Sequence, residues 1–328
     1  MIHLITGGAG FIGSHLADAL VARDDDVVIL DDLSTGTRDN IEHLLGSGRV
    51  RLVEGSTLDE PLVDELMDQV DSCFHLASAV GVQLVVQRPL DSLLRNVRGA
   101  DIVTAAAALH GRRLVYASTS EIYGKRTDGA LREDSDRLLG TPSKSRWSYA
   151  TAKTFGEMLA FGYTREQDAE MIVVRLFNTV GPRQTGAYGM VLPRFVRQAL
   201  AEEDLTVYGD GTQTRCFAHV EDSVDAILRL MAHGQAVGQV FNVGASSEIT
   251  IAELAARVIE RTGSSSKIRF VPYEEAYGEG FEELGRRKPD TSALERLTGW
   301  RARRTVWDAI DDTIAYERGS LAALRAVA

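Results

Sequence analysis

The sequence predicts an α/β protein in which a doubly wound, Rossmann-type parallel sheet is followed by a smaller, mixed α/β substrate lobe. Short apolar runs alternate with helical patterns over the first 178 residues, glycines follow the first run directly, and the pattern changes after residue 178. This alternation indicates βαβ units, and their right-handed crossovers leave few topologies. We therefore expect one domain over residues 1–178 and a second mainly over 179–328.

The first domain is predicted from strands of apolar residues separated by segments with helical spacing. The expected strands cover residues 2–6, 26–30, 49–55, 72–78, 112–118 and 170–178. The expected helices cover residues 14–24, 62–70 and 95–111. Helical connections of this length favour parallel pairing of successive strands.

The second lobe is richer in glycine and proline, as in GPRQTGAYGMVLP and YGDGTQ. A helix is expected over 192–203. A further helix should begin with a capping box, Thr250 with Glu253, and end at Gly263. The boundary between the domains is soft, because the chain is expected to return to the first domain at about 216–244.

Composition excludes several classes of protein. The 328 residues are 44% hydrophobic and 25% charged, with a net charge of −11, which argues against binding of nucleic acid. We expect neither a signal peptide nor a membrane span, and a cytoplasmic location. Cys73 and Cys216 lie far apart, which predicts two buried, unreactive thiols, no metal site and a reducing compartment.

A glycine fingerprint follows the first expected strand. TGGAGFIGSH places Gly7, Gly10 and Gly13 between a strand and a helix, where backbone can approach a pyrophosphate at the helix N-terminus. Asp31 and Asp32 end the second strand, at the spacing of a carboxylate that binds ribose. A carboxylate there repels a 2′-phosphate, so NAD is favoured over NADP. The alternative is a structural tight turn followed by a solvated aspartate.

A tyrosine and a lysine are spaced to share one face of a helix. RWSYATAKTFGE contains Tyr149 and Lys153, four residues apart. A free tyrosine has a pKa of about 10. A neighbouring lysine cation and a positive nicotinamide ring would favour the phenolate, which could take a proton from an alcohol during hydride transfer. YxxxK alone is weak evidence, but here it follows the glycine fingerprint.

Taken together, TGGAGFIG, HLAS, NVRG, STSEIYG, YATAK and RLFNTVGPR resemble the extended short-chain dehydrogenase/reductase family. That family contains NAD-dependent nucleotide-sugar epimerases, dehydratases and decarboxylases. The resemblance implies that Tyr149 is the base, that Lys153 orients it and that Thr119 binds the sugar hydroxyl at C4. With the fingerprint, it implies a set of cofactor-binding residues: Gly7, Gly10, Phe11, Ile12, Gly13, Asp31, Asp32, Ser34, Thr35, Gly36, Leu76, Ala77, Asn96, Ser118, Tyr149 and Lys153.

The resemblance also implies a nucleotide-sugar site in the second lobe. Its expected residues are Asn178, Val191, Arg194, Tyr208, Arg215, Arg287 and Asp290. Asn178, Arg215 and Arg287 would contact the diphosphate, since an arginine can bind phosphate oxygens in pairs. The alternative for each arginine is a solvated surface position. The acidic segment EEAYGEGFEEL, at 274–284, is expected to be a solvated loop or a lid.

Ser120 and Glu121 bear on the reaction. After oxidation at C4 of a sugar, the family's enzymes epimerise it, decarboxylate it or eliminate water. The dehydratases pair an aspartate with a glutamate at this position, so Ser120 disfavours dehydration. STSE and RRKPD resemble UDP-glucuronate decarboxylases, whereas YATAK and Met190 depart from them. Glu121 is a catalytic or water-orienting group, a supporting residue of an epimerase, or a partly exposed carboxylate.

From these motifs we expect NAD-dependent 4-epimerisation of a UDP-sugar, UDP-glucuronate or UDP-glucose, through a 4-keto intermediate. The alternative is a UDP-glucuronate decarboxylase that forms UDP-xylose. A non-catalytic NAD-binding regulator is a third reading, and the set Thr119, Tyr149 and Lys153 argues against it. The expected partners are the UDP-sugar and a second copy of the chain in a homodimer, with neither nucleic acid nor membrane.

Overall fold

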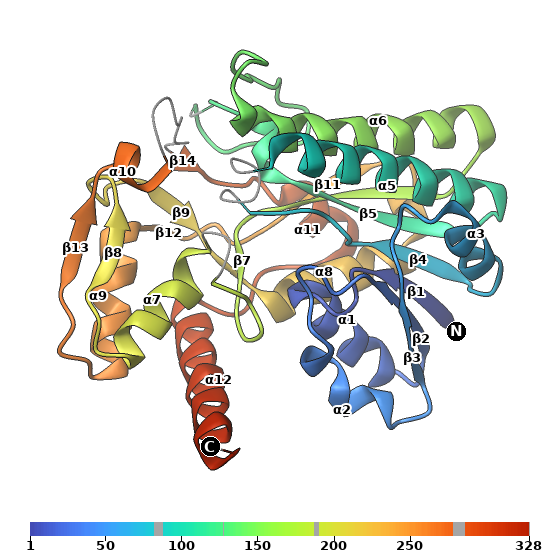
Figure 1. Cartoon of the computed structure of the whole chain (residues 1–328). Helices are drawn as coiled ribbons and strands as arrows, with labels where there is room; N and C mark the ends of the chain where they lie inside the picture. Colours follow the sequence, from blue (N-terminus) through green and yellow to red (C-terminus); the bar gives the residue numbers. More distant parts are fainter. Residues whose placement is uncertain (82–87, 127, 187–189, 278–285, 328) are drawn as a thin grey trace.

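The computed structural model describes residues 1–81, 88–126, 128–186, 190–277 and 286–327. Within these residues the first domain is built on a seven-stranded parallel sheet in the order β11-β6-β5-β4-β1-β2-β3 (Figure 1). The strands are β1 (Ile2–Thr6), β2 (Asp26–Asp31), β3 (Val50–Glu54), β4 (Ser72–His75), β5 (Arg113–Thr119), β6 (Met171–Leu176) and β11 (Val240–Val243). The order reverses between β1 and β4, so the predicted doubly wound class is confirmed.

Helices cover both faces of this sheet. On one face lie α3 (Glu60–Asp68), α5 (Pro89–Leu109) and α6 (Ser148–Gln167), whose apolar side chains pack with Leu4, Leu114 and Val173. On the other lie α1 (Phe11–Val21), α2 (Glu42–Leu45), α8 (Val220–Ala232) and α11 (Ser292–Thr298), packed on Ile5 and Val115. Strands buried on both faces explain the continuous apolar runs of the sequence.

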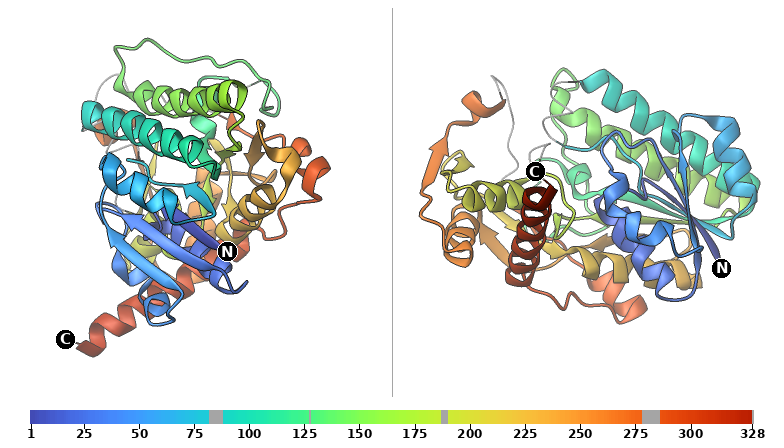
Figure 2. Two further views of the ribbon diagram at one scale, coloured as in Figure 1. Left: turned by 90° about the vertical axis from the view of Figure 1, so that its right-hand side faces the viewer. Right: turned by 60° about the horizontal axis from the view of Figure 1, so that its bottom comes forward.

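The second lobe has its own hydrophobic core, and its helices and strands lie beside the first domain (Figure 2). Its elements are β7 (Thr179–Val180), α7 (Val191–Leu200), β8 (Leu205–Tyr208), β9 (Thr214–Cys216), β10 (Ala218–His219), β12 (Glu248–Thr250), α9 (Ile251–Thr262), β13 (Ile268–Val271), α10 (Tyr273–Tyr277), β14 (Arg286–Arg287) and α12 (Val306–Val327). Phe195, Leu254 and Ile310 bring α7, α9 and α12 together. Small sheets, β12-β9-β14 and β13-β8, lie beside these helices.

Local signals in the sequence placed several elements correctly. The capping box of Thr250 and Glu253 opens α9, which ends at Gly263 with a φ of 70°. The expected return to the first domain is seen in α8, which packs on α1, and in β11, which pairs with β6. The division at residue 178 stays a prediction. Helix α5 begins at Pro89, earlier than the predicted start at residue 95. The sequence pattern missed the first turns because Leu90 and Leu94, although apolar, are exposed and do not follow the buried face of the helix.

Cys73 and Cys216 are free thiols, and their expected burial is confirmed. Burial raises the pKa of the Cys216 thiol to about 12. Among the described residues, the helices are not both long and apolar enough to cross a bilayer.

Gly156 should be essential for the position of α6. A Cβ atom there would lie 2.1 Å from the hydroxyl oxygen of Tyr116, a fully buried side chain of β5. We expect Gly156→Ala to lower the free energy of unfolding by about 1–3 kcal/mol, as overpacked cores do. Gly319→Ala is the control, because nothing lies within 4 Å of its added Cβ atom in α12. That change should stabilise by roughly 0.5–1 kcal/mol. Equal effects in denaturant titrations would contradict this account.

Candidate active site

The glycine loop between β1 and α1 is packed too closely for side chains. Gly7 has a φ of 74°, and a Cβ atom there would lie 2.7 Å from the backbone nitrogen of Ala77. At Gly13 an added Cβ atom would lie 2.2 Å from the carbonyl oxygen of Gly7. Helix α1 begins after Gly10 without a side-chain cap, so its first N–H groups suit an anionic ligand. Phe11 and Ile12 form its first turn.

The two aspartates at the end of β2 have different surroundings. Asp31 is buried and accepts hydrogen bonds from the backbone N–H of Ala9 and of Leu33, both at 2.9 Å. Burial raises its pKa. Asp32 is more exposed and accepts hydrogen bonds from Ser34 and from Arg95 at 3.2 Å. Asp31 therefore braces the glycine loop, and both carboxylates stay candidates for the ribose.

Other predicted cofactor residues lie at the same edge of the sheet. Gly36 packs against the backbone of Ala9, and Thr35 beside it is exposed. The backbone N–H groups of Leu76 and Ala77 donate to the carbonyl and hydroxyl oxygens of Thr6. The side-chain amide of Asn96 holds the two residues that follow Ala77. Its oxygen accepts from the hydroxyl of Ser78 and the backbone N–H of Ala79, and its nitrogen donates to the carbonyl of Ala79. The edge thus has a fixed backbone against which a dinucleotide can lie.

Tyr149 lies at the start of α6, against the end of β5. Its hydroxyl has hydrogen-bonding contacts with Ser78 and Thr119. Burial raises its pKa, the charge of Glu121 adds to this, and both hydrogen bonds oppose it. Thr119 also caps the 3₁₀ turn η2 (Ser120–Tyr123) by accepting from the N–H of Glu121 at 3.2 Å. The structure therefore brings together the predicted pair of Tyr149 and Thr119.

Lys153 lies one turn further along α6 and is buried. Its Nζ donates to the carbonyl oxygen of Ala117 at 2.8 Å and lies 5.1 Å from the centre of the Tyr116 ring. Burial lowers its pKa to about 7, while the charge of Glu157 opposes this shift. Burial in this pocket thus disfavours both the lysine cation and the phenolate.

Glu121 lies between two arginines. Arg146, in η3 (Ser145–Trp147), donates to Glu121 Oε2, and Arg287, in β14, donates to Oε1 at 3.2 Å. The side chain of Glu121 is 16% exposed and those of both arginines 8%. Burial would raise the pKa of Glu121, but the two arginines hold it at about 2. Glu121 is thus a mostly buried, ionised member of an ion-pair cluster at the end of the strand, and its role in the reaction stays a prediction.

Neighbouring Ser118 and Ser120 are also buried. The hydroxyl of Ser118 donates to Glu157 at 2.5 Å, and Glu157 in turn accepts from Arg175 Nε at 3.0 Å and Nη2 at 2.8 Å. Sequence reasoning missed Ser78, Arg146 and Glu157. Arg146 lies three residues before Tyr149, within the same quoted motif, and that spacing was the available signal.

The predicted substrate residues lie mostly in the second lobe. Arg215 and Arg287 are register partners on β9 and β14. The guanidinium of Arg194 lies 4.1 Å from the ring centre of Tyr208 and donates to the carbonyl of Thr206 at 3.0 Å. These roles stay predictions, as does that of Val191 at the start of α7.

Asn178 and Asp290 have partners within the protein. Asn178 donates to the carbonyl of Cys216 at 3.3 Å, and the carboxylate of Asp290 accepts from the N–H of Ser292 at 2.9 Å. Residues 278–284 of the predicted acidic loop or lid lie outside the described residues. The part of the chain that is described has no cluster of three His, Cys, Asp or Glu suited to a metal.

Comparisons with known proteins agree with this geometry. The profile of the NAD dependent epimerase/dehydratase family matches residues 3–244. The chain belongs to this family. It is an enzyme of the nucleotide-sugar epimerase and dehydratase type, and its cofactor is NAD.

Individual relatives differ in their reactions. The chain is 42% identical to the UDP-N-acetyl-alpha-D-glucosaminuronate decarboxylase of Bacillus cytotoxicus, over 96% of this chain and 97% of the relative. It is 34% identical to UDP-glucuronic acid decarboxylase 1 of Xenopus tropicalis, over 97% of this chain and 72% of that one. The UDP-glucuronic acid 4-epimerase of Bacillus cereus, solved with UDP-glucuronic acid and NAD, superposes with a TM-score of 0.87 at 25% identity, over 98% and 100% of the chains.

The ionised state of Glu121 gives a prediction for pH dependence. Arg146 is one of the two cations that offset the effect of burial on the pKa of Glu121. Arg146→Gln should therefore raise this pKa, and activity should be lost at a higher pH when the solution is acidified. The folded pKa lies below the unfolded value of about 4.3. The cluster therefore stabilises the fold above that pH and loses this contribution as pH falls toward 2.

Profiles of kcat/KM against pH would check this. Arg257→Gln is the control, since exposed Arg257 pairs with the exposed Glu260 on α9. An acid limb at the same pH in wild type and both variants would contradict the assignment.

Proposed function

We propose that this enzyme decarboxylates a UDP-hexuronate, with the N-acetylated UDP-glucosaminuronate as the first candidate and UDP-glucuronate as the second. The observation that carries this proposal is the cluster of Glu121, Arg146 and Arg287 close to Tyr149. Glu121 is paired there with two arginines, both of them mostly buried. Arginines can bind a carboxylate in pairs of hydrogen bonds, so a carboxylate at C6 of the sugar would find suitable donors in this cluster, which a neutral hexose would not use in this way.

Sequence relatives support the same choice. The relative that matches at 42% identity over nearly the whole of both chains is named a decarboxylase of the N-acetylated uronate. The match to a glucuronate decarboxylase is weaker, at 34%. We therefore rank decarboxylation of a UDP-uronate ahead of 4-epimerisation. The sequence motifs alone had placed UDP-glucuronate decarboxylation second.

The residues present allow the steps of this reaction. Bound NAD supplies a hydride acceptor, and the glycine loop with Asp31 and Asp32 would hold it. Tyr149, with Thr119, takes the proton from the C4 hydroxyl. The resulting 4-keto uronate is a β-keto acid, and breaking its C5–C6 bond releases carbon dioxide while the electron pair moves to the C4 oxygen. With a pKa of about 2, Glu121 is not the acid that then protonates C5. It orients the arginines and a water, which would supply the C5 proton. Tyr149 would then return its proton to the C4 oxygen as hydride returns to C4, so that the cycle consumes no NAD.

Epimerisation at C4 of a UDP-sugar remains the second candidate. Epimerisation shares the oxidation at C4 with decarboxylation. The enzyme of Bacillus cereus that superposes on this chain acts on a uronate and is named a 4-epimerase. The motif YATAK, which departs from the decarboxylase pattern, also favours it.

Product analysis separates the two candidates. Purified protein with NAD would be incubated with UDP-N-acetylglucosaminuronate, UDP-glucuronate and UDP-glucose, and each nucleotide sugar examined by mass spectrometry and proton NMR. We expect one uronate to lose the mass of carbon dioxide and UDP-glucose to stay unchanged. A uronate or glucose of unchanged mass with a new H4 coupling would overturn the decarboxylase and establish the epimerase.

Tyr149→Phe should lower kcat about 10²–10⁴-fold with either product, because the base is removed while the ring still fills its place. Tyr163→Phe is the matched control, since Tyr163 lies further along α6 and packs with the apolar side chains beneath it. Turnover of Tyr149→Phe at the wild-type rate would mean that another group accepts the proton.

We further propose that two copies of the chain associate through α5 and α6. These helices lie side by side on the outer side of the sheet (Figure 1). Leu90, Leu94, Phe155 and Met158 are exposed on them, with Leu90 and Met158 at 67% and 61%. Exposed apolar side chains on two neighbouring helices are suited to a self-complementary interface between two copies of the chain.

Met158→Glu should therefore convert the dimer to a monomer, because it places a charge in the interface. Phe270→Glu makes the same kind of change at an exposed apolar residue of β13 and should leave the dimer intact. Sedimentation equilibrium would measure the masses. A monomeric wild type, or a dimer in both variants, would refute the proposed interface.

A further inference from the structure

We propose that Tyr123 and Asn242 are positioning residues that set Glu121 against Arg287. This inference rests on the proposed function, because Glu121 and Arg287 are the groups that would act on the uronate. Tyr123 and Asn242 form hydrogen bonds with residues other than Glu121. Both are buried, and their side chains meet at the end of the 3₁₀ turn that carries Glu121.

The hydroxyl of Tyr123 is held from two sides. It accepts a hydrogen bond from Arg175 Nη1 at 2.9 Å and donates one to Asn242 Oδ1 at 2.7 Å. Tyr123 is the last residue of η2 and Glu121 the second, so a four-residue turn connects this hydroxyl to the carboxylate. Fixing one end of so short a turn limits where the other end can lie.

Asn242 connects this point to the segment that carries Arg287. Its Nδ2 donates to the carbonyl oxygens of Leu131 at 2.9 Å and Asp290 at 3.1 Å. Leu131 also pairs with this segment through backbone hydrogen bonds to Lys288 and Asp290, both 2.8 Å. Lys288 directly follows Arg287, so the backbone beside Arg287 is tied to Asn242.

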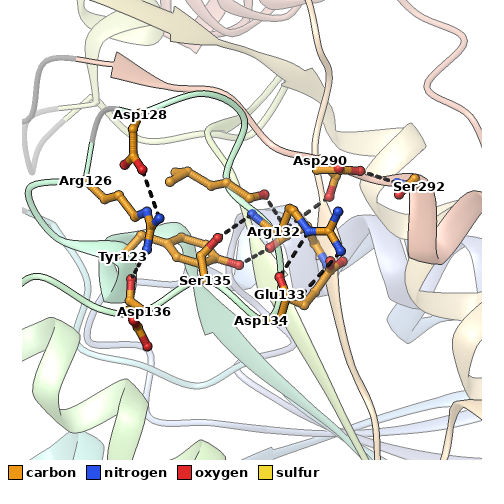
Figure 3. Close-up of polar contacts among 12 residues, drawn as sticks. Tyr123, Arg126, Asp128, Arg132, Glu133, Asp134, Ser135, Asp136, Asp290 and Ser292 are labelled. Atoms are coloured by element: carbon orange, nitrogen blue, oxygen red, sulfur yellow. Dashed lines mark hydrogen bonds and ion pairs between the residues drawn. The ribbon is translucent and has the colours of Figure 1, made fainter.

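The loop over 128–136 supports this connection (Figure 3). Arg126 donates to the carbonyl of Asp136, Arg132 pairs with Asp134, and the backbone N–H of Arg132 donates to the hydroxyl oxygen of Ser135. The loop also supplies Glu133, which accepts from the backbone N–H of Asn242 at 2.8 Å.

These contacts close a ring. It runs from Glu121 through η2 to Tyr123, across Asn242 to Asp290, back along the chain to Arg287, and through the ion pair to Glu121. The ring joins β11 of the first domain to β14 of the second lobe. The hydroxyl of Tyr123 and the side-chain amide of Asn242 each both donate and accept hydrogen bonds within this network, and a satisfied buried polar group favours one geometry.

A double-mutant cycle tests whether Tyr123 acts through Glu121. Tyr123→Phe keeps the ring and removes only the hydroxyl. We expect kcat for carbon dioxide release to fall about tenfold with KM changed little, because catalysis is sensitive to small displacements of positioned groups. In a Glu121→Gln background the same change should lower kcat less than about twofold, since the group being positioned is already altered. Asn242→Asp, which removes the Nδ2 donors, should reproduce both results.

Tyr163→Phe serves as the control for loss of a hydroxyl, and melting temperatures show that each variant is folded. Full, additive losses in the Glu121→Gln background would overturn the inference while leaving the decarboxylase intact. If wild type releases no carbon dioxide but epimerises, the proposed function fails, and the same cycle is measured on epimerisation. A Glu121→Gln variant with the wild-type rate for that reaction would also overturn the inference, because nothing would then need positioning.

Discussion

The ion pair between Arg175 and Glu157 is the interaction on which the active-site geometry depends. Both side chains are buried within the first domain, between β6 and α6. Leaving one of the two side chains unpaired there would cost about 3–5 kcal/mol. The N–H groups of Arg175 that do not face Glu157 also need acceptors, because they are buried as well. They are satisfied by Tyr123 and by the carbonyl of Glu133, while Ser118 donates to Glu157. The requirement for stability thereby fixes the end of β5 and the turn that follows it.

A second buried charge joins the two lobes. Glu121 belongs to the first domain, and of its two arginines one comes from η3, just before α6, and the other from β14 of the second lobe. The whole chain carries a net charge of −11, yet two arginines meet a single glutamate here. Any attraction for an anionic sugar would therefore be local to the cluster, where burial makes a charge effective over a short distance.

Much of the fold could be predicted from the sequence because its signals are local. The strand at residues 2–6, the glycine turn, the capping box of α9 and the tyrosine–lysine spacing each depend on residues close together in the chain. The supporting residues of the site carry no such signal. Tyr123 meets Asn242 across 119 positions, and Glu121 meets Arg287 across 166. Periodicity describes which face of an element is apolar, and it does not describe which buried polar groups meet.

The cluster also bears on how the proposed reaction and its epimerase alternative diverge. Oxidation at C4 turns any C6 carboxylate into a β-keto acid, so an enzyme for a uronate must either hold this carboxylate firmly or let it leave. Arginines that bind it fully stabilise the ground state and retard the loss of carbon dioxide. Here Glu121 already takes hydrogen bonds from Arg146 and Arg287. On the proposed function, a substrate carboxylate would share these donors and would be held less firmly than by two uncommitted arginines. As the C5–C6 bond breaks, the negative charge would move toward the C4 oxygen. We therefore propose that an ionised glutamate near the departing carboxylate favours decarboxylation over return of the hydride to an intact uronate.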